Sequence, residues 1–341
     1  MIASIKVKEA SFYRKLKSKK VMCELCPHLC EIENKKSGFC EVRHNQEGVL
    51  YSLNYGRLKR TKVLKIEELH LFHFLPGSKT LAITTVGCNF RCDYCNVSDI
   101  AIEKIKPILG RTLLPKDVVK LAQHNKCDSI TYDFTEPTIY YEYVYDIAIE
   151  AHRVGFKNVF ATNGYITEEP LQKILPLLDA VVFYLKGFNE ENYNFIMRGH
   201  LEPVLSSLKI IAESEAWLEV KTSFIPKLNT DFQEIQKIIL FLRGLNPNIP
   251  WHIYKTIPQY KMKDRSPLAR KDLREIYECA SKMGLYYPYV ANMVHNKFQN
   301  TLCPYCGSIV IYRIGSQFKK SYLVGGGCHT CGHEIPGVFN T

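Results

Sequence analysis

Residues 81–96 read LAITTVGCNFRCDYCN, a strand-like run that leads directly into three closely spaced cysteines. Residues 81–86 are apolar or β-branched, as in a strand buried within a sheet. Cys88, Cys92 and Cys95 follow on one loop in a Cys-x3-Cys-x2-Cys pattern. Three thiolates can hold three irons of a cubane 4Fe–4S cluster and leave the fourth iron open for chemistry, whereas ordinary ferredoxin clusters use four cysteines. The competing interpretation is a structural zinc loop, but structural zinc normally takes four nitrogen or sulfur ligands.

Five further strand-like runs follow, and helical patterns separate them. The runs are residues 129–135, 158–163, 180–185, 217–225 and 251–257. Between them, apolar residues recur at steps of three and four, which indicates amphipathic helices. This alternation predicts an α/β fold with parallel strands and helices packed outside. A closed eight-stranded barrel would need two more units, so we expect a partial (β/α)6 barrel with its chemistry at the carboxyl ends of the strands.

The 341 residues divide into four segments by composition. Residues 1–20 are a basic N-terminal segment, and residues 21–78 form a small cysteine-rich domain that ends at the turn residues Pro76, Gly77 and Ser78. Residues 79–299 form the predicted barrel. Residues 300–341 form a compact cysteine-containing tail.

Thirteen cysteines are far more than a reducing compartment normally requires, so we expect metal sites. Eleven of them fall in three clusters, while Cys127 and Cys279 stand alone and fit small buried hydrophobic positions. No apolar run is long enough for a membrane helix, and residues 1–20 lack the apolar core of a signal peptide. We therefore expect a cytoplasmic protein without membrane contact. The net charge of +11 favours an acidic partner such as RNA, a phosphorylated metabolite or an acidic protein.

The tail has the cysteine spacing of a zinc ribbon. Two Cys-x2-Cys pairs, Cys303 with Cys306 and Cys328 with Cys331, are separated by 21 residues. Each pair is followed by a glycine that lets backbone amides approach the sulfurs. This spacing strongly predicts a metal site, and structural zinc is its commonest occupant.

The N-terminal cysteines are less regular. Cys23, Cys26, Cys30 and Cys40 offer four thiolates within eighteen residues. His28 is a candidate to replace one of them. Zinc or a second iron–sulfur cluster would suit this ligand set, and the knuckle-like CELC favours zinc.

Motifs along nearly the whole chain from Cys23 onward resemble the AmmeMemoRadiSam-system radical S-adenosylmethionine (SAM) enzymes, relatives of the pyruvate formate-lyase activating enzymes. In chain order they are CELCPHLC (23–30), YSLNYGR (51–57), FHFLPGSK (72–79), VGCNFRCDYCN (86–96), FTEPT (134–138), KNVFATNGY (157–165), LKGF (185–188), PQYKM (258–262), CPYCG (303–307) and CGHEIPGV (331–338). The resemblance implies a 4Fe–4S cluster on Cys88, Cys92 and Cys95 with SAM on its open iron. It also implies reductive cleavage of SAM to methionine and a 5′-deoxyadenosyl radical, with ferredoxin or flavodoxin as the reducing partner.

The same resemblance assigns SAM contacts by position. Tyr94 would lie beside the adenine, and Lys186 would pair with the SAM carboxylate. Strand-end residues would supply the remaining contacts, with the acid binding the SAM ammonium: Thr135, Glu136 and Pro137 after the second strand, and Thr162, Asn163 and Gly164 after the third.

Three positions depart from the family pattern. Activating enzymes carry acids that help to bind a monovalent cation beside SAM, and this chain has Tyr184 and Ala161 at those positions. Ile257 stands where many members have histidine. Because a cation of this kind needs oxygen ligands, the resemblance does not extend to the cation site. We expect a subgroup with a different substrate.

The substrate is not identified by these motifs. Lys186 and His252 are our candidate catalytic residues, and further candidates near the predicted strand ends are Tyr132, Asp133, Lys255 and Tyr260. The predicted reaction is hydrogen abstraction from an unidentified substrate, with a protein or acidic molecule as a possible partner. One alternative is an activase that installs a glycyl radical on a protein. Another is a noncatalytic zinc protein that binds RNA, but it leaves the three-cysteine loop unexplained.

Overall fold

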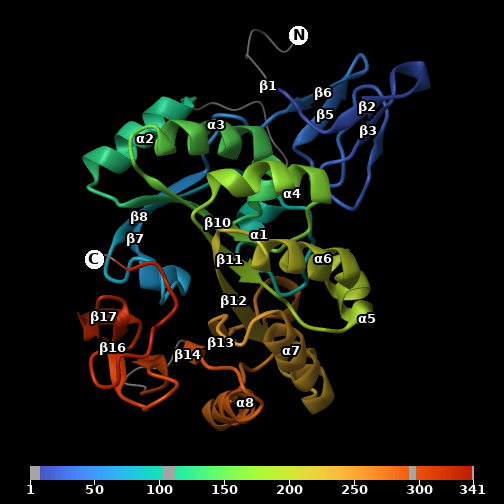
Figure 1. Ribbon diagram of the computed structural model, residues 1–341. Coiled ribbons are helices and arrows are strands. Elements are labelled where there is room, and N and C mark those ends of the chain that lie inside the picture. The colour runs from blue at the N-terminus through green and yellow to red at the C-terminus, as the bar shows by residue number, and fades with distance from the viewer. Residues whose placement is uncertain (1–7, 103–111, 292–296, 340–341) are drawn as a thin grey trace.

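The computed structural model describes residues 8–102, 112–291 and 297–339. An open eight-stranded sheet runs through the middle of the molecule in the order β14-β13-β12-β11-β10-β9-β8-β7 (Figure 1). Strands β8 to β14 are parallel to their neighbours, and β7 pairs antiparallel with β8. The strands are β7 (Arg60–Lys65), β8 (Lys79–Thr84), β9 (Ser129–Tyr132), β10 (Lys157–Thr162), β11 (Ala180–Tyr184), β12 (Trp217–Phe224), β13 (Trp251–Lys255) and β14 (Pro288–Ala291).

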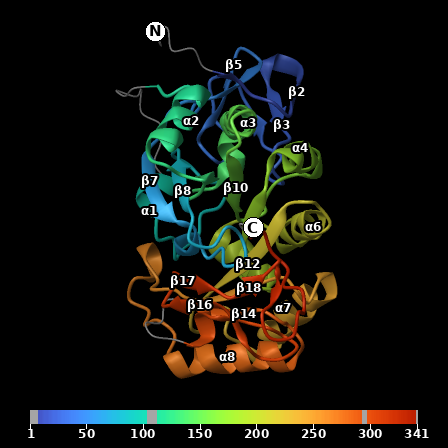
Figure 2. The same ribbon diagram turned by 60° about the vertical axis from the view of Figure 1, so that its left-hand side comes forward.

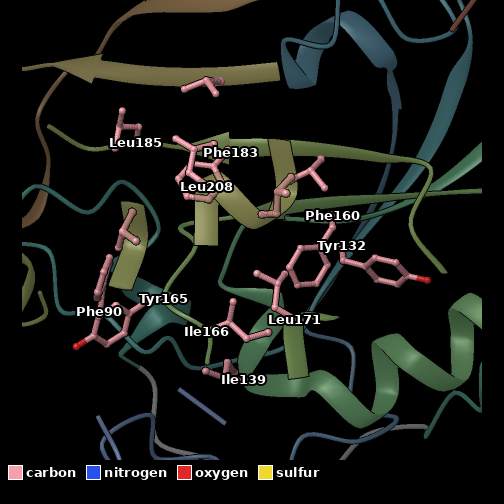
Figure 3. Close-up of a cluster of buried hydrophobic side chains, with 14 of the residues drawn as sticks. Phe90, Tyr132, Ile139, Phe160, Tyr165, Ile166, Leu171, Phe183, Leu185 and Leu208 are labelled. Atoms are coloured by element: carbon pink, nitrogen blue, oxygen red, sulfur yellow. The ribbon is translucent and has the colours of Figure 1, made fainter. Parts of the chain in front are cut away.

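Helices connect these strands and cover the outer face of the sheet (Figures 1 and 2). The α-helices are α1 (Ser98–Ala101), α2 (Pro115–His124), α3 (Tyr141–His152), α4 (Glu168–Ile174), α5 (Glu190–Asn192), α6 (Leu201–Ala212), α7 (Phe232–Leu245) and α8 (Arg270–Lys282). Short 3-10 helices are η1 (Lys17–Lys19), η2 (Ile66–Leu69), η3 (Pro137–Tyr140), η4 (Leu175–Leu177), η6 (Tyr260–Met262) and η7 (Lys297–Gln299). The element η5 (Tyr193–Met197) is a short π-helix. Figure 3 shows part of the core between strands and helices, which includes Phe160, Phe183 and Leu208. Burial on both faces explains why the central strands read as continuous apolar runs.

The prediction of a parallel α/β barrel is confirmed, and the sheet is larger than the six strands expected. β14 adds a seventh parallel strand from only four residues. β7 reads RTKVLK and is largely exposed, as charged edge strands are. Because β7 lies within residues 21–78, this segment contributes the antiparallel edge strand of the main sheet.

Two small three-stranded sheets form the N-terminal part of the molecule. One has the order β1-β6-β5 and the other β2-β3-β4. Their strands are β1 (Lys8–Glu9), β2 (Tyr13–Lys15), β3 (Val21–Cys23), β4 (Glu31–Ile32), β5 (Arg43–Gln46) and β6 (Val49–Ser52). The described part of the basic segment 1–20 is therefore folded into these sheets.

The C-terminal tail lies at the opposite end of the molecule from the N-terminal sheets (Figures 1 and 2). Its strands are β15 (Thr301–Leu302), β16 (Ile309–Ile314), β17 (Gln317–Ser321), β18 (Leu323–Val324) and β19 (Gly327–Cys328). Buried Arg313 fixes the tail to the segment between β7 and β8, because its guanidinium donates a 2.6 Å hydrogen bond to the carbonyl oxygen of Phe72.

Candidate active site and metal centres

A pocket lies where the carboxyl ends of the parallel strands meet the three-cysteine loop. Its wall includes most of the residues that the sequence predicts to contact a cofactor: Cys88, Cys92, Cys95, Tyr94, Thr135, Glu136, Asn163 and Lys186. Pro137, Thr162 and Gly164 are not among the lining residues and lie behind them. The strand-end rule for parallel sheets thus brings together side chains that are distant in sequence.

The three-cysteine loop is held in place through Asn89. The Asn163 side chain donates to Asn89 Oδ1 at 2.9 Å, and Asn89 Nδ2 donates to the carbonyl oxygen of Tyr165 at 2.7 Å. The Phe90 amide points at Cys88 Sγ across 3.4 Å, a contact that favours a thiolate. Burial raises the pKa of the Cys88 thiol to about 12 and that of Cys92 to about 11. These thiols thus need a positive partner to ionise, and a bound metal centre provides one.

Glu136 organises the two strand ends beside this loop. Its Oε1 accepts hydrogen bonds from the Thr138 and Thr162 hydroxyls at 2.6 and 2.8 Å, and its Oε2 accepts from the Asn163 amide at 2.8 Å. Burial raises its pKa above the ordinary value, against the effect of these hydrogen bonds. Thr162 therefore acts on the pocket through Glu136.

Gly164 has a structural reason to be glycine. Its φ is +73°, and a Cβ there would lie 2.2 Å from Cζ of Phe183. Any side chain would both strain this turn and clash with the core.

Lys186 extends into the pocket from just beyond β11. Its Nζ lies 6.0 Å from the ring centres of Tyr94 and of Tyr184. Its backbone is fixed on both sides, because the amide donates to the Tyr193 hydroxyl and the carbonyl oxygen accepts from Asn229 Nδ2. The ammonium is thus carried on an anchored backbone beside the cysteine loop.

Several pocket residues were missed by the sequence analysis. The lining also includes Lys221 and Ser223 of β12, Tyr254 of β13, and Thr256 just beyond β13. The predicted cofactor contacts lie at strand ends, whereas Lys221 lies inside a strand. The alternation of polar Glu219, Lys221 and Ser223 along β12 was the available signal, because alternate residues of a strand share one face.

Of the further candidates Tyr132, Asp133, Lys255 and Tyr260, Asp133 is the one that lines the pocket. Phe134 after it has φ +65°, a conformation that few non-glycine residues adopt and that is often found at functional sites. Tyr132, Lys255 and Tyr260 are not among the lining residues. The Tyr132 hydroxyl instead donates to Asn158 Oδ1 in the core at 2.9 Å.

His252 lies in a buried network instead of the pocket. Its Nε2 is 2.7 Å from Glu219 Oε2, and that carboxylate also accepts the backbone amides of Phe72 and His73. Both His252 and Glu219 are fully buried. The expectation that His252 is catalytic is therefore corrected. His252 faces the interior of the sheet, two residues before the pocket-lining Tyr254 on β13, and it is not among the residues that line the pocket.

The tail cysteines form a compact group of sulfurs. Cys303, Cys306, Cys328 and Cys331 have their sulfurs within 4.8 Å of one another. Sγ of Cys303 lies 3.6 Å from that of Cys331, and Sγ of Cys306 lies 3.6 Å from that of Cys328. Tetrahedral zinc with Zn–S bonds of about 2.3 Å requires sulfur separations close to these.

The N-terminal cysteines are neighbours without such close packing. Burial raises the pKa of Cys26, and the charges of the neighbouring thiolates of Cys23, Cys40 and Cys30 raise it further. The four cysteines therefore lie in one cluster. Across the described ranges, however, the tail group is the one set in which three or more such ligand atoms lie within 4.8 Å of one another. The sulfurs of Cys88, Cys92 and Cys95 likewise do not all lie within 4.8 Å of one another.

The N-terminal module, which comprises strands β1 to β6, also contacts the loop of Cys88, Cys92 and Cys95 directly. His28 Nε2 lies 2.7 Å from the carbonyl oxygen of Asn89, so His28 has a partner other than a metal. A Cβ on Gly87 would lie 2.9 Å from the carbonyl oxygen of Cys40. Because Gly87 precedes Cys88, the two cysteine groups are joined through packed backbone.

Residues 82–242 match the family model described as the Radical SAM superfamily. An uncharacterized protein of Methanocaldococcus jannaschii is 36% identical over 332 residues, which cover 96% of this chain and 99% of that protein. Another protein of that organism, named provisionally as a glycyl-radical enzyme activating enzyme, is 26% identical over 54% of this chain and 71% of its own length. The crystal structure of a radical SAM methyltransferase from Sphaerobacter thermophilus has a TM-score of 0.50 at 14% identity, covering 65% of this chain and 68% of that one, a likeness of fold. In the described part of the chain no helix could cross a bilayer.

Proposed function

The chain belongs to the radical SAM superfamily, and from that premise we propose an AmmeMemoRadiSam-type enzyme that holds its catalytic cluster on Cys88, Cys92 and Cys95. The observation that carries this proposal is the position of the three thiols at the wall of the pocket that Glu136, Asn163 and Lys186 also line. Three cysteines on one loop suit a cluster with one open iron. When bound, the cluster and SAM supply the reductive cleavage that yields methionine and a 5′-deoxyadenosyl radical for hydrogen abstraction.

The residues of the pocket would bind and orient SAM. Lys186 offers an ammonium group for the SAM carboxylate, and the Glu136 carboxylate offers a charge-assisted contact for the SAM ammonium. Tyr94 is buried in the wall and offers a ring face for the adenine. Thr135 and Asn163 complete the polar side. Enclosing these groups in a pocket keeps water away from the reacting atoms.

Deoxyadenosine formation tests the cluster assignment. We expect anaerobically reconstituted protein with SAM and dithionite to form 5′-deoxyadenosine, and Cys92→Ala to form none while keeping the metal of the tail. Cys279→Ala is the matched control, because this cysteine lies outside the three clusters. Cleavage by Cys92→Ala at the rate of the unchanged protein would contradict the assignment.

For the tail we propose structural zinc, on the basis of the 3.6 Å sulfur separations. For the N-terminal cysteines we propose a second iron–sulfur cluster in preference to zinc. Their wider spacing supports this choice, since a cubane places several irons between the sulfurs. Contact with the catalytic loop would suit a cluster that passes electrons to it.

Iron counting tests the N-terminal assignment. Two 4Fe–4S clusters correspond to about eight irons per chain, and Cys40→Ser should remove about four of them. Cys92→Ala should remove the other four. If Cys40→Ser instead removes one zinc and no iron, the N-terminal cysteines bind zinc.

The partners follow from this chemistry. We propose a one-electron donor such as ferredoxin or flavodoxin, and the cytoplasm as the compartment, because thirteen cysteines, most of them assigned to metal sites, and a cluster with an open iron require reducing conditions. The net charge of +11 suits such acidic proteins.

A second candidate function is activation of a protein by installing a glycyl radical. The relative named provisionally as a glycyl-radical enzyme activating enzyme favours it. Co-expression with candidate glycyl-radical enzymes, followed by electron paramagnetic resonance for a glycyl radical, would test it. If no partner protein gives a glycyl-radical signal, the remaining function is hydrogen abstraction from another substrate.

A further inference from the structure

The part of the pocket formed by β11, β12 and β13 is built differently from the part beside the cysteine loop. Strand register places Tyr184 of β11 next to Lys221 of β12, and Ser223 of β12 next to Tyr254 of β13. Thr256, just beyond β13, lines the same pocket. These side chains face one another without involving the cysteine loop.

Lys221 carries a charge into this region with little to neutralise it. Its Nζ lies over the Tyr254 ring at 4.0 Å from the centre and 5.3 Å from that of Tyr184. No hydrogen bond or ion pair joins this ammonium to any residue within the described ranges. A partly buried ammonium of this kind needs an anionic partner, and the aromatic faces supply only part of that stabilisation.

Thr256 provides an independent sign of a missing ligand. This residue is 7% exposed, and its Oγ1 has no hydrogen-bond partner among the residues that the structure describes. Unpaired buried hydroxyls are uncommon because each one costs free energy. A hydroxyl and an ammonium that line one pocket can both donate hydrogen bonds to the same acceptor.

The nearest carboxylate is already engaged. Asp133 accepts a 2.9 Å hydrogen bond from the Tyr184 hydroxyl, and it forms no ion pair within 4.0 Å of Lys221. Lys186 adds a second positive charge to the same pocket. Arg91 also lines the pocket, so three basic side chains face the carboxylates of Asp133 and Glu136, and this balance favours an incoming anion over a cation.

We propose that Lys221 and Thr256 form a subsite that binds an anionic group, a carboxylate or a phosphate, of the substrate. The proposal rests on the proposed function, because it assumes that SAM occupies the part of the pocket beside the cysteine loop. Tyr254 then stacks under the ammonium, and Lys186 remains with SAM.

The ionisation of Lys221 supports this subsite. Burial, and then the charge of Lys186, lower its pKa to about 8, against the opposing effect of Asp133. The ammonium is therefore charged below pH 8, and anion binding should weaken as the pH rises through that value. The ionisable groups that face Lys221 are Asp133 after β9, Tyr184 and Lys186 on and beyond β11, His252 and Tyr254 of β13, and His70 after η2.

Lysine-selective NMR of the SAM-loaded holoprotein tests the subsite. With 13Cε-labelled lysine, the Lys221 signal is identified by its absence in Lys221→Met. We expect acetate or inorganic phosphate at constant ionic strength to shift this signal saturably, and neutral acetamide to leave it unchanged. Comparing the two anions tells a carboxylate subsite from a phosphate subsite. Lys227, exposed on the loop after the same strand, is the matched control and should not respond.

Two variants complete the test. Thr256→Val should weaken the response to the anion about tenfold, as expected for loss of a hydrogen bond to a charged group. Lys221→Arg keeps the charge, and equilibrium dialysis with labelled acetate or phosphate should show that it retains anion binding even if Lys221→Met folds poorly. The proposal is overturned if neither anion shifts the Lys221 signal, or if SAM alone abolishes the response. It is also overturned if Lys221→Met weakens SAM binding as much as Lys186→Met. Failure of the proposed function differs from all of these, because no deoxyadenosine would then form.

Discussion

The Tyr184 hydroxyl donates a 2.9 Å hydrogen bond to Asp133 Oδ1 across the pocket. Tyr184 stands where the resemblance to activating enzymes places an acid. The pocket thus keeps a carboxylate near this position, but Asp133 supplies it from the end of β9. Burial raises the pKa of Asp133, and the Tyr184 hydrogen bond and the charge of Lys221 oppose that rise. A single, already hydrogen-bonded carboxylate is a weak basis for a cation site.

We therefore expect SAM cleavage to depend little on potassium. Replacing potassium by a large organic cation should change the rate of deoxyadenosine formation less than twofold or so, because the second acid is missing at Ala161. Ionic strength must be held constant, since a chain of net charge +11 responds to salt in general. A pronounced potassium requirement would mean that Asp133 and backbone oxygens suffice to bind the ion.

Lys186→Met should weaken SAM binding. The substitution keeps most of the side-chain volume and removes the ammonium that we assign to the SAM carboxylate. Loss of one charge-assisted contact corresponds to about tenfold or more in dissociation constant. Equilibrium dialysis with labelled SAM measures it, and the exposed Lys227→Met is the control for lost positive charge. Equal affinities of all three proteins would remove Lys186 from the SAM site.

Removal of zinc should unfold the tail. Cys306→Ser in the full-length protein takes one ligand from the group of four sulfurs, so we expect loss of about one zinc per chain and a lower melting temperature. Tyr305 beside it is highly exposed, so Tyr305→Ser is a control that leaves the sulfurs intact. A Cys306→Ser protein that melts like the control would show that the ribbon is stable without metal.

Local spacing predicted most of the candidate site. The positions of Cys88, Glu136 and Lys186 follow from where strands end, because all parallel strands of one sheet end on the same side. Lys221 was missed because it lies within a strand, and His252 was assigned to the pocket although it lies one inward-facing layer too deep. Lys221 and His252 are paired in register, yet the lysine side chain lines the pocket while His252 contacts Glu219. Depth thus depends on register and side-chain length together, and register is not visible in the sequence.

The N-terminal module depends on one buried ion pair, and breaking it should be costly. Arg43 of β5 lies 3.1 Å from Glu142 of α3, and both side chains are nearly inaccessible. Glu142→Gln keeps the shape but leaves a buried guanidinium without a countercharge, for which we expect a loss of about 3 kcal/mol in the free energy of unfolding.

Glu150 of the same helix provides the matched control, because its pair with Arg153 is exposed to solvent. Glu150→Gln should cost less than about 1 kcal/mol. Urea unfolding of both metal-loaded variants makes the comparison. Arg43 follows Cys40 by three residues, so the loosened module of Glu142→Gln should also lose the N-terminal metal faster to a chelator, while Glu150→Gln should not. Equal stability and equal metal retention in the two variants would show that the Arg43–Glu142 pair does not hold the module to the barrel.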